Sequence, residues 1–130
     1  MSPQAPPVPV VYQALGEAFL EALKGRNFNA MFNLFQPNVR SRLLLPSGLS
    51  TPTSAAELGG KYESWFSEAD QFEVTSFEVS RIGLSLAMHY SIRLHLQDGW
   101  FVVQQKTYSE IASGRIQFFD LLCSGVHPAE

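Results

Sequence analysis

Apolar side chains occupy every second position from Leu84 to Leu96, and the positions between them include two histidines and an arginine. Such side chains bind metals, transfer protons or hold anions. On one strand His89, Arg93 and His95 share a face, but the two histidines lie six residues apart. That separation is roughly 20 Å along a strand, which is too far for both rings to hold one ion. We therefore expect no metal site and no cofactor.

Asp120 is the residue whose surroundings most suggest chemistry. In the last predicted strand it lies in phase with Phe118 and Leu122, and an unpaired carboxylate on such an apolar face is costly. Asp120 therefore faces a pocket as an acid or base, or strand twist carries it to an edge, or a cation neutralises it. Three cations could serve: Arg40, Arg42 and Lys106.

Tyr90 stands on the apolar face of the long strand and is the natural polar partner inside a cavity. Asp120 and Tyr90 are thus the catalytic candidates, one as acid or base and the other as an orienting donor. Aromatic and thioether side chains could complete a lipophilic pocket, although such stripes are also typical of plain core. The candidate ligand-binding residues are Tyr62, Trp65, Met88, Tyr90, Phe118 and Asp120.

Two helices are predicted near the N-terminus to position these side chains. Apolar residues recur at helical spacing over residues 10–24, and Gly25 is placed to end that helix in a left-handed conformation. Asn27 can cap a short second helix that carries apolar residues as far as Phe35, and Pro37 stops it.

A third helix begins at a capping box formed by Ser54 and Glu57 and runs to about Glu68. Gly59 and Gly60 either weaken its first half or let it approach a neighbour closely.

The remaining chain reads as sheet. The predicted strands cover residues 39–45, 72–82, 84–97, 100–111 and 115–124. The apolar phase slips by one near Thr75 and Ser76, which predicts a β-bulge or a break there. A strand of fourteen residues spans roughly 45 Å and must twist and curve. The fold class is therefore α+β, with a curved mixed or antiparallel sheet wrapped around about three helices as a cystatin-like cone.

Composition limits the classes of function. A chain of 130 residues with net charge −3 and scattered cations does not suit nucleic-acid binding. No apolar run is long enough for a membrane span, and the one cysteine, Cys123, fits a reducing compartment, so we expect a cytoplasmic protein. Residues 1–9 read as a disordered proline-rich tail and residues 10–126 as a single domain.

The last two strands carry apolar residues on both faces, which predicts that both faces are covered. The helices can cover one face, and a second copy of the chain most simply covers the other. The expected homodimer interface comprises His89, Arg93, Phe101, Val103, Phe119 and Leu121.

Three segments together resemble the nuclear transport factor two-like superfamily, in its SnoaL-like branch. They are Leu23-Lys24-Gly25 at the end of the first helix, residues 31–38 before the first strand, and Gly114-Arg115-Ile116 before the last strand. The resemblance implies a cone with an apolar pocket at its open end, often dimeric through the sheet. Its members include isomerases, cyclases, epoxide hydrolases, dehydratases and proteins that only bind or assemble.

The family's known chemistries lack their residues in this chain. Isomerase-like members use an aspartate on the first strand and a tyrosine on the first helix, whereas residues 39–45 hold no carboxylate and Phe19 stands near the tyrosine position. Epoxide-hydrolase-like members use an Asp-Arg-Asp set, which Arg93, His95 and Asp120 match only in distorted form.

We therefore expect a SnoaL-like protein that binds a small apolar molecule, without catalysis of its own. The first alternative is a SnoaL-like cyclase, isomerase or hydrolase acting on a hydrophobic substrate. The second is a dimeric assembly module whose cone is filled by its own side chains.

Overall fold

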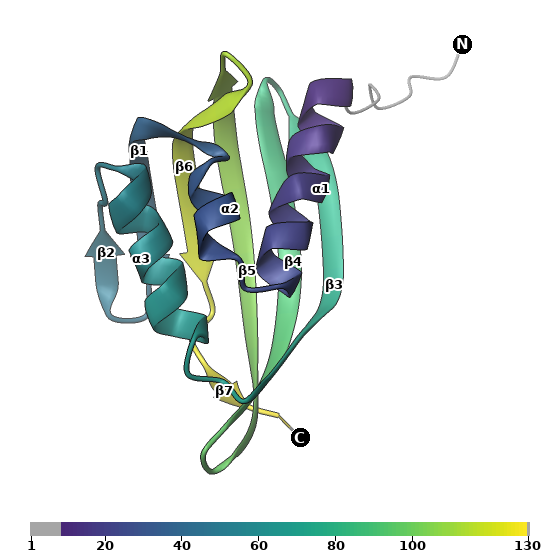
Figure 1. Ribbon diagram of the computed structural model, residues 1–130, viewed down its shortest axis with the longest axis vertical. Coiled ribbons are helices and arrows are strands. Elements are labelled where there is room, and N and C mark those ends of the chain that lie inside the picture. Colours follow the sequence, from purple (N-terminus) through teal and green to yellow (C-terminus); the bar gives the residue numbers. More distant parts are fainter. Residues whose placement is uncertain (1–8, 130) are drawn as a thin grey trace.

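The computed structural model describes residues 9–129, so all of the predicted tail except Pro9 lies outside the described residues. The helices are α1 (Val10–Lys24), α2 (Phe28–Phe32) and α3 (Ala55–Phe66). The strands are β1 (Phe35–Leu45), β2 (Gly48–Ser50), β3 (Gln71–Ile82), β4 (Ser85–Leu96), β5 (Gly99–Ala112), β6 (Arg115–Cys123) and β7 (His127–Pro128). Figure 1 shows the helices lying in front of the sheet.

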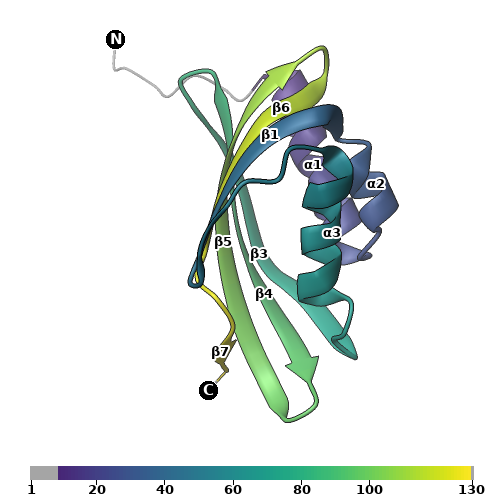
Figure 2. The same ribbon diagram turned by 90° about the vertical axis from the view of Figure 1, so that its left-hand side faces the viewer.

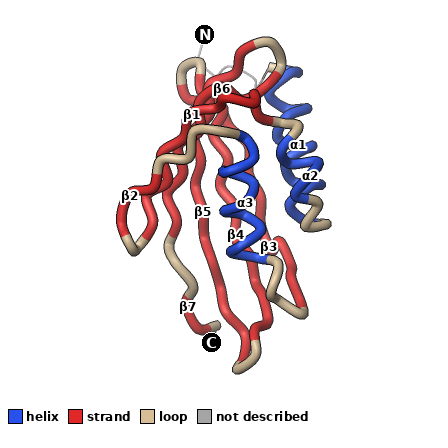
Figure 3. Tube along the Cα trace, turned by 60° about the vertical axis from the view of Figure 1, so that its left-hand side comes forward, coloured by secondary structure: helices blue, strands red, loops and turns tan. Residues whose placement is uncertain are grey.

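One mixed sheet forms the frame of the molecule. Its strand order is β2-β1-β6-β5-β4-β3, and β7 adds to β5. The β1–β6 pair is parallel and the other pairs are antiparallel. The sheet curves around the helices, which all lie on its concave side (Figure 2), and the loop from β2 to α3 passes beside β1 (Figure 3). The predicted α+β cone is confirmed.

The turn after α1 differs from its prediction. Gly25 has a right-handed backbone with φ −85°, and Arg26 takes the left-handed conformation instead, with φ 49°. The Arg26 guanidinium donates to the carbonyl oxygens of Phe66 (3.0 Å) and Ala69 (2.6 Å). These hydrogen bonds hold the strained turn against the end of α3, which explains how a residue other than glycine is tolerated there.

The predicted caps of the other two helices are confirmed, and the length of the second helix is corrected. The Asn27 side chain accepts from the Ala30 N–H at 3.1 Å and so caps α2. The Ser54 hydroxyl accepts from the Glu57 N–H at 3.1 Å, and Glu57 accepts from the Thr53 N–H at 3.2 Å, so the capped start of α3 is confirmed. The second helix is shorter than predicted, because α2 ends at Phe32 and β1 already begins at Phe35.

The predicted bulge in β3 is confirmed, because the pairing with β4 shifts between Val74 and Ser76. A second bulge was not predicted. Ile111 of β5 pairs with Ile116, whereas the preceding Glu110 pairs with Phe118, so Gln117 is an extra residue in β6. One extra residue turns every later side chain to the opposite face. Phe119 and Leu121 consequently point into the cone, and Phe118 points out.

Alternating side chains of β4 supply one wall of the core, as the sequence pattern predicts. The buried set on this strand includes Leu86, Met88, Tyr90, Ile92 and Leu94. Their partners on β5 share the inner face, since Leu94 pairs with Phe101 and Ile92 with Val103.

Close packing of α3 against α2 yields a stability prediction. A Cβ atom on Gly59 would overlap the Phe32 ring, whereas one on Gly60 would meet no atom within 4 Å. We expect Gly59→Ala to lower the free energy of unfolding by about 1–3 kcal/mol through overpacking. The adjacent Gly60→Ala should raise it by about 0.5–1 kcal/mol through helix propensity. Urea unfolding of both variants checks this, and equal effects at the two positions would contradict the packing.

Candidate functional site

The structure divides the predicted ligand-binding residues between the two faces of the sheet. Tyr62, Met88 and Tyr90 are buried inside the cone, and Trp65 is half-buried beside them. Phe118 and Asp120 lie on the outer face, because the Gln117 bulge reverses the phase of β6. The prediction that these residues line one pocket is wrong, and the two faces must be treated as separate sites.

A string of hydrogen-bonded side chains crosses the interior. The Tyr62 and Tyr90 hydroxyls are 2.9 Å apart, and Tyr90 donates to Gln105 Oε1 at 2.6 Å. Gln105 Nε2 donates in turn to Cys123 Sγ at 3.4 Å. Sheet register brings the last three together, since Gln105 on β5 pairs with Tyr90 on one side and Cys123 on the other. The string therefore runs from α3 to the end of β6.

Burial keeps the two tyrosines protonated. Removal from water disfavours the phenolate and raises the pKa of both Tyr62 and Tyr90 well above the ordinary value of 10.0. Among the described residues, the buried polar side chains are Ser41, Gln105, Thr107 and Ser109, with no carboxylate, imidazole or ammonium. The interior can thus donate and accept hydrogen bonds, but its described groups include no general base for neutral pH.

Aromatic rings fill the space in which a pocket was expected. The Phe19 ring centroid lies 6.0 Å from that of Tyr62, 5.7 Å from that of Tyr90 and 6.4 Å from that of Phe119. All of these rings are fully buried. Side chains of the protein thus occupy the centre of the cone.

Two hydroxyl groups in the interior have no partner among the described residues. Thr107 Oγ1 and Ser109 Oγ are buried and accept or donate no hydrogen bond there. Both lie on β5, on the same face as Gln105. A buried hydroxyl without a hydrogen-bond partner lowers the free energy of unfolding by roughly 1–3 kcal/mol. Substituting these two residues therefore tests whether the interior holds a further partner, such as water, for their hydroxyls.

Asp120 is neutralised on the outer face by Arg42, one of the three cations considered for that role. Arg42 Nε lies 2.8 Å from Asp120 Oδ1, and the terminal nitrogen of Arg42 lies 2.7 Å from Oδ2. The hydrogen bond to Asp120, aided by its charge, raises the pKa of Arg42. Asp120 and Tyr90 project from opposite faces of the sheet, so the predicted pairing of acid and orienting donor is wrong.

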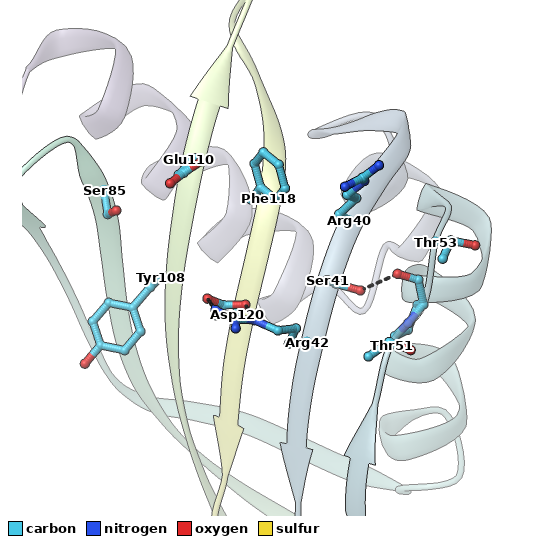
Figure 4. Close-up of a pocket in the computed structure, with 11 residues that line it drawn as sticks. Arg40, Ser41, Arg42, Thr51, Thr53, Ser85, Tyr108, Glu110, Phe118 and Asp120 are labelled. Atoms are coloured by element: carbon cyan, nitrogen blue, oxygen red, sulfur yellow. Dashed lines mark hydrogen bonds and ion pairs between the residues drawn. The ribbon is translucent and has the colours of Figure 1, made fainter.

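A groove of about 670 Å³ opens on this outer face. Most of its floor comes from three neighbouring strands, with Ser85 of β4 at one side and the loop residues Thr51 and Thr53 at the other. The floor residues are Arg40 and Arg42 of β1, Phe118 and Asp120 of β6, and Tyr108 and Glu110 of β5. Figure 4 shows Phe118 between Glu110 and Arg40, with the Arg42–Asp120 pair beside them.

A second, apolar hollow of about 330 Å³ continues from the groove. It shares Arg42, Tyr108 and Asp120 with the groove and adds four leucines: Leu44, Leu49, Leu121 and Leu122. The two hollows together form one surface that is charged at one end and apolar at the other.

The expected dimer residues are also divided. Val103, Phe119 and Leu121 are core residues, and Phe101 packs against the core, so their assignment to the outer face is wrong. The sequence could not choose a face for them, because both faces of these strands carry apolar residues. His89 and Arg93 do lie on the outer face, where the Arg93 guanidinium stacks 4.0 Å above the Trp100 ring centroid.

His95 participates in an exposed pair that the sequence analysis did not identify. Its Nδ1 lies 2.8 Å from Asp70 Oδ1, and this hydrogen bond lowers the pKa of Asp70. Within residues 9–129 no group of three or more histidine, cysteine or carboxylate side chains is placed to hold a metal ion. The described helices also include none with the length and hydropathy needed to cross a bilayer.

Comparison with solved structures finds the same fold in proteins of low sequence identity. A LEH-like epoxide hydrolase from M. tuberculosis is 16% identical, with a TM-score of 0.67 over 91% of this chain and 86% of that protein. A nuclear transport factor two-like protein of unknown function from Burkholderia xenovorans is 15% identical, with a TM-score of 0.69 over 92% and 86%. A candidate polyketide cyclase from Xanthomonas campestris is 13% identical, with a TM-score of 0.68 over 86% and 89%. The sequence matches no family model and no curated protein.

Matched serine substitutions test whether the interior is dry. Ser109 Oγ has no partner among the described residues, whereas Ser41 Oγ donates to the Pro52 carbonyl oxygen at 2.8 Å. We expect Ser109→Ala to leave the free energy of unfolding unchanged or to raise it by up to about 1 kcal/mol, and Ser41→Ala to lower it by about 1 kcal/mol. Chemical denaturation measures both. An equal loss at Ser109 would mean that its hydroxyl has a partner inside the cone.

Proposed function

We propose that this chain, which has the nuclear transport factor two-like fold, binds a small apolar or amphipathic molecule on the outer face of its sheet and catalyses no reaction of its own. The observation that carries the proposal is the groove of about 670 Å³, which lies within the roughly 300–1,000 Å³ of small-molecule sites. The aromatic ring of Phe118 on its floor and the charged groups around it supply the mixture of apolar surface and few polar contacts that such sites use.

The filled cone supports placing the ligand outside it. A molecule inside would have to displace the rings of Phe19, Tyr62 or Phe119, and it would lose the contacts that these buried rings make with one another. The outer groove requires no such displacement.

The polar groups of the groove support binding without catalysis. Both oxygens of Asp120 accept hydrogen bonds from Arg42, so this carboxylate is engaged in an ion pair. No histidine lines the groove, and Glu110 is exposed to water. Glu110 is the carboxylate of the groove that forms no ion pair with a described residue, so it would be the first candidate acid or base if this groove were an active site, as the alternative of a cyclase or hydrolase on the same fold requires.

A second candidate function is assembly with another copy of the chain. Three leucines on the outer side of β1, β2 and β6 are exposed: Leu44 (53%), Leu49 (64%) and Leu122 (52%). Neighbouring exposed apolar side chains are typical of contact surfaces. In this candidate the homodimer contact moves from the core residues predicted by the sequence to these leucines.

Ligand binding predicts a thermal shift that depends on Phe118. A lipophilic ligand present at about a hundred times its Kd should stabilise the native state by about 2.7 kcal/mol and raise Tm by several degrees. Phe118→Ala should abolish this rise, which is measured for each variant against its own unliganded Tm, because the ring supplies apolar surface on the floor of the groove. Leu84→Ala is the control, since Leu84 is also exposed and lies outside the groove. A ligand shift that survives in Phe118→Ala would contradict this site.

Assembly predicts a change of mass in solution. If the leucines form a homodimer contact, light scattering at about 100 µM chain should give twice the chain mass. To be stable, such a contact would have to bury roughly 1,200–2,000 Å² in total. Leu122→Glu should then return the protein to a monomer by burying an unpaired charge. A wild-type monomer at this concentration would contradict the second candidate.

A further inference from the structure

We propose that the ligand of the outer groove is a zwitterionic amphiphile, with an anionic and a cationic group at its head and an apolar tail. This inference rests on the proposed function of the groove and specifies the chemistry of its ligand. The argument uses two rows of side chains that cross the strands, named here the Phe118 row (Arg40, Phe118 and Glu110) and the Asp120 row (Arg42, Asp120 and Tyr108). The pairings β1–β6 and β6–β5 place each row at matched positions.

The Phe118 row presents opposite charges on either side of an aromatic ring. Arg40 pairs in register with Phe118, and Phe118 pairs with Glu110 (Figure 4). Strands lie about 4.8 Å apart, so the backbones of Arg40 and Glu110 are separated by roughly 10 Å. Both side chains are exposed, and neither forms an ion pair with another described residue.

The Asp120 row shows why the charges of the Phe118 row are left for a ligand. In the Asp120 row the arginine and the carboxylate occupy adjacent strands and bind each other directly. In the Phe118 row a phenylalanine separates them. An anionic ligand would pair with Arg40 but approach Glu110, and a cationic ligand would do the reverse. A zwitterion satisfies both, and opposite charges at matched positions favour it by electrostatic complementarity.

The apolar hollow gives the direction of the tail. From Phe118 to Leu122 the chain advances four residues along β6, or roughly 13 Å. Leu44 pairs with Leu122 there, and Leu49 completes the apolar lining. A molecule with its head over Phe118 would pass the Asp120 row and bury its tail against these leucines.

A second copy of the chain suits the Phe118 row less well than a small molecule. Two-fold symmetry about the row would set one concave groove against another and enclose a void. Stable interfaces are instead packed as densely as protein interiors.

Four probes with unbranched alkyl tails of nine or ten carbons test the head group by titration calorimetry on the full chain, each below its micelle concentration. They are decylphosphocholine (zwitterion), decanoate (anion), decyltrimethylammonium (cation) and decyl maltoside (uncharged). We expect decylphosphocholine to bind about fivefold more tightly than any of the others, as two exposed charge pairs allow.

Single variants should separate the two charges. Arg40→Gln should weaken binding of decanoate and decylphosphocholine but not of decyltrimethylammonium, and Glu110→Gln should weaken binding of decyltrimethylammonium and decylphosphocholine but not of decanoate. Lys24→Gln and Glu63→Gln, on the helices, are matched controls that should change none of the affinities.

The outcomes distinguish this inference from the function on which it rests. Equal affinity for all four probes, abolished by Phe118→Ala, would overturn the zwitterionic head and support the groove as a binding site. Absence of binding by every probe would overturn both. Light scattering could instead show that the protein is a dimer and that all four probes dissociate it at the same probe concentration. This result would overturn the inference in favour of assembly, because the head group would then make no difference.

Discussion

One extra residue in β6 decides which side chains build the interior and which form the outer surface. Gln117 has no partner in the pairing of β6 with β5, so the inward phase that Ile116 begins is continued by Phe119 and Leu121. The aromatic core depends on this change, because the Phe119 ring lies 5.2 Å from that of Phe35 and 6.4 Å from that of Phe19. The same change sends Asp120 outward to the parallel neighbour β1, where Arg42 meets it.

The filled cone follows from this arrangement. Phe19 from α1 meets both tyrosines, and Phe119 from the sheet meets Tyr62. The tyrosine hydroxyls are satisfied along the string that ends at Cys123. A fully bonded polar string inside an apolar core costs little, whereas a broken one costs the desolvation of each orphaned group. Side chains therefore fill the interior where a ligand could otherwise bind. Two interior hydroxyls, those of Thr107 and Ser109, have no hydrogen-bond partner among the described residues.

Much of this frame could be predicted from sequence because its signals are local. Strict alternation located β4, a phase slip located the β3 bulge, and the Ser54–Glu57 pair located the start of α3. The β6 bulge carries a weaker signal, since Phe118 and Phe119 are both apolar and either phase places apolar residues on both faces. A prediction that continues the phase of Ile116 through β6 places Asp120 in an inner pocket and Phe119 at an outer interface, and both placements are wrong. The β1 partner that pairs with Asp120 lies 78 residues away, a distance over which sequence patterns specify no contact.

Opposite faces of a strand can carry independent functions, and this constrains how the fold relates to chemistry. Proteins with this fold include a LEH-like epoxide hydrolase and a candidate polyketide cyclase, at 16% and 13% identity, so the shared frame does not specify the reaction. In this chain the inward residues of β5 and β6 are committed to packing, and a change there leaves a cavity or an unpaired group. The outward residues contact water and one another, so their charges can change at little cost in stability. Charges on the outer face can therefore be exchanged at a lower cost in stability than residues of the core, and in the proposed binding site the opposite charges around Phe118 are the groups through which specificity would be set.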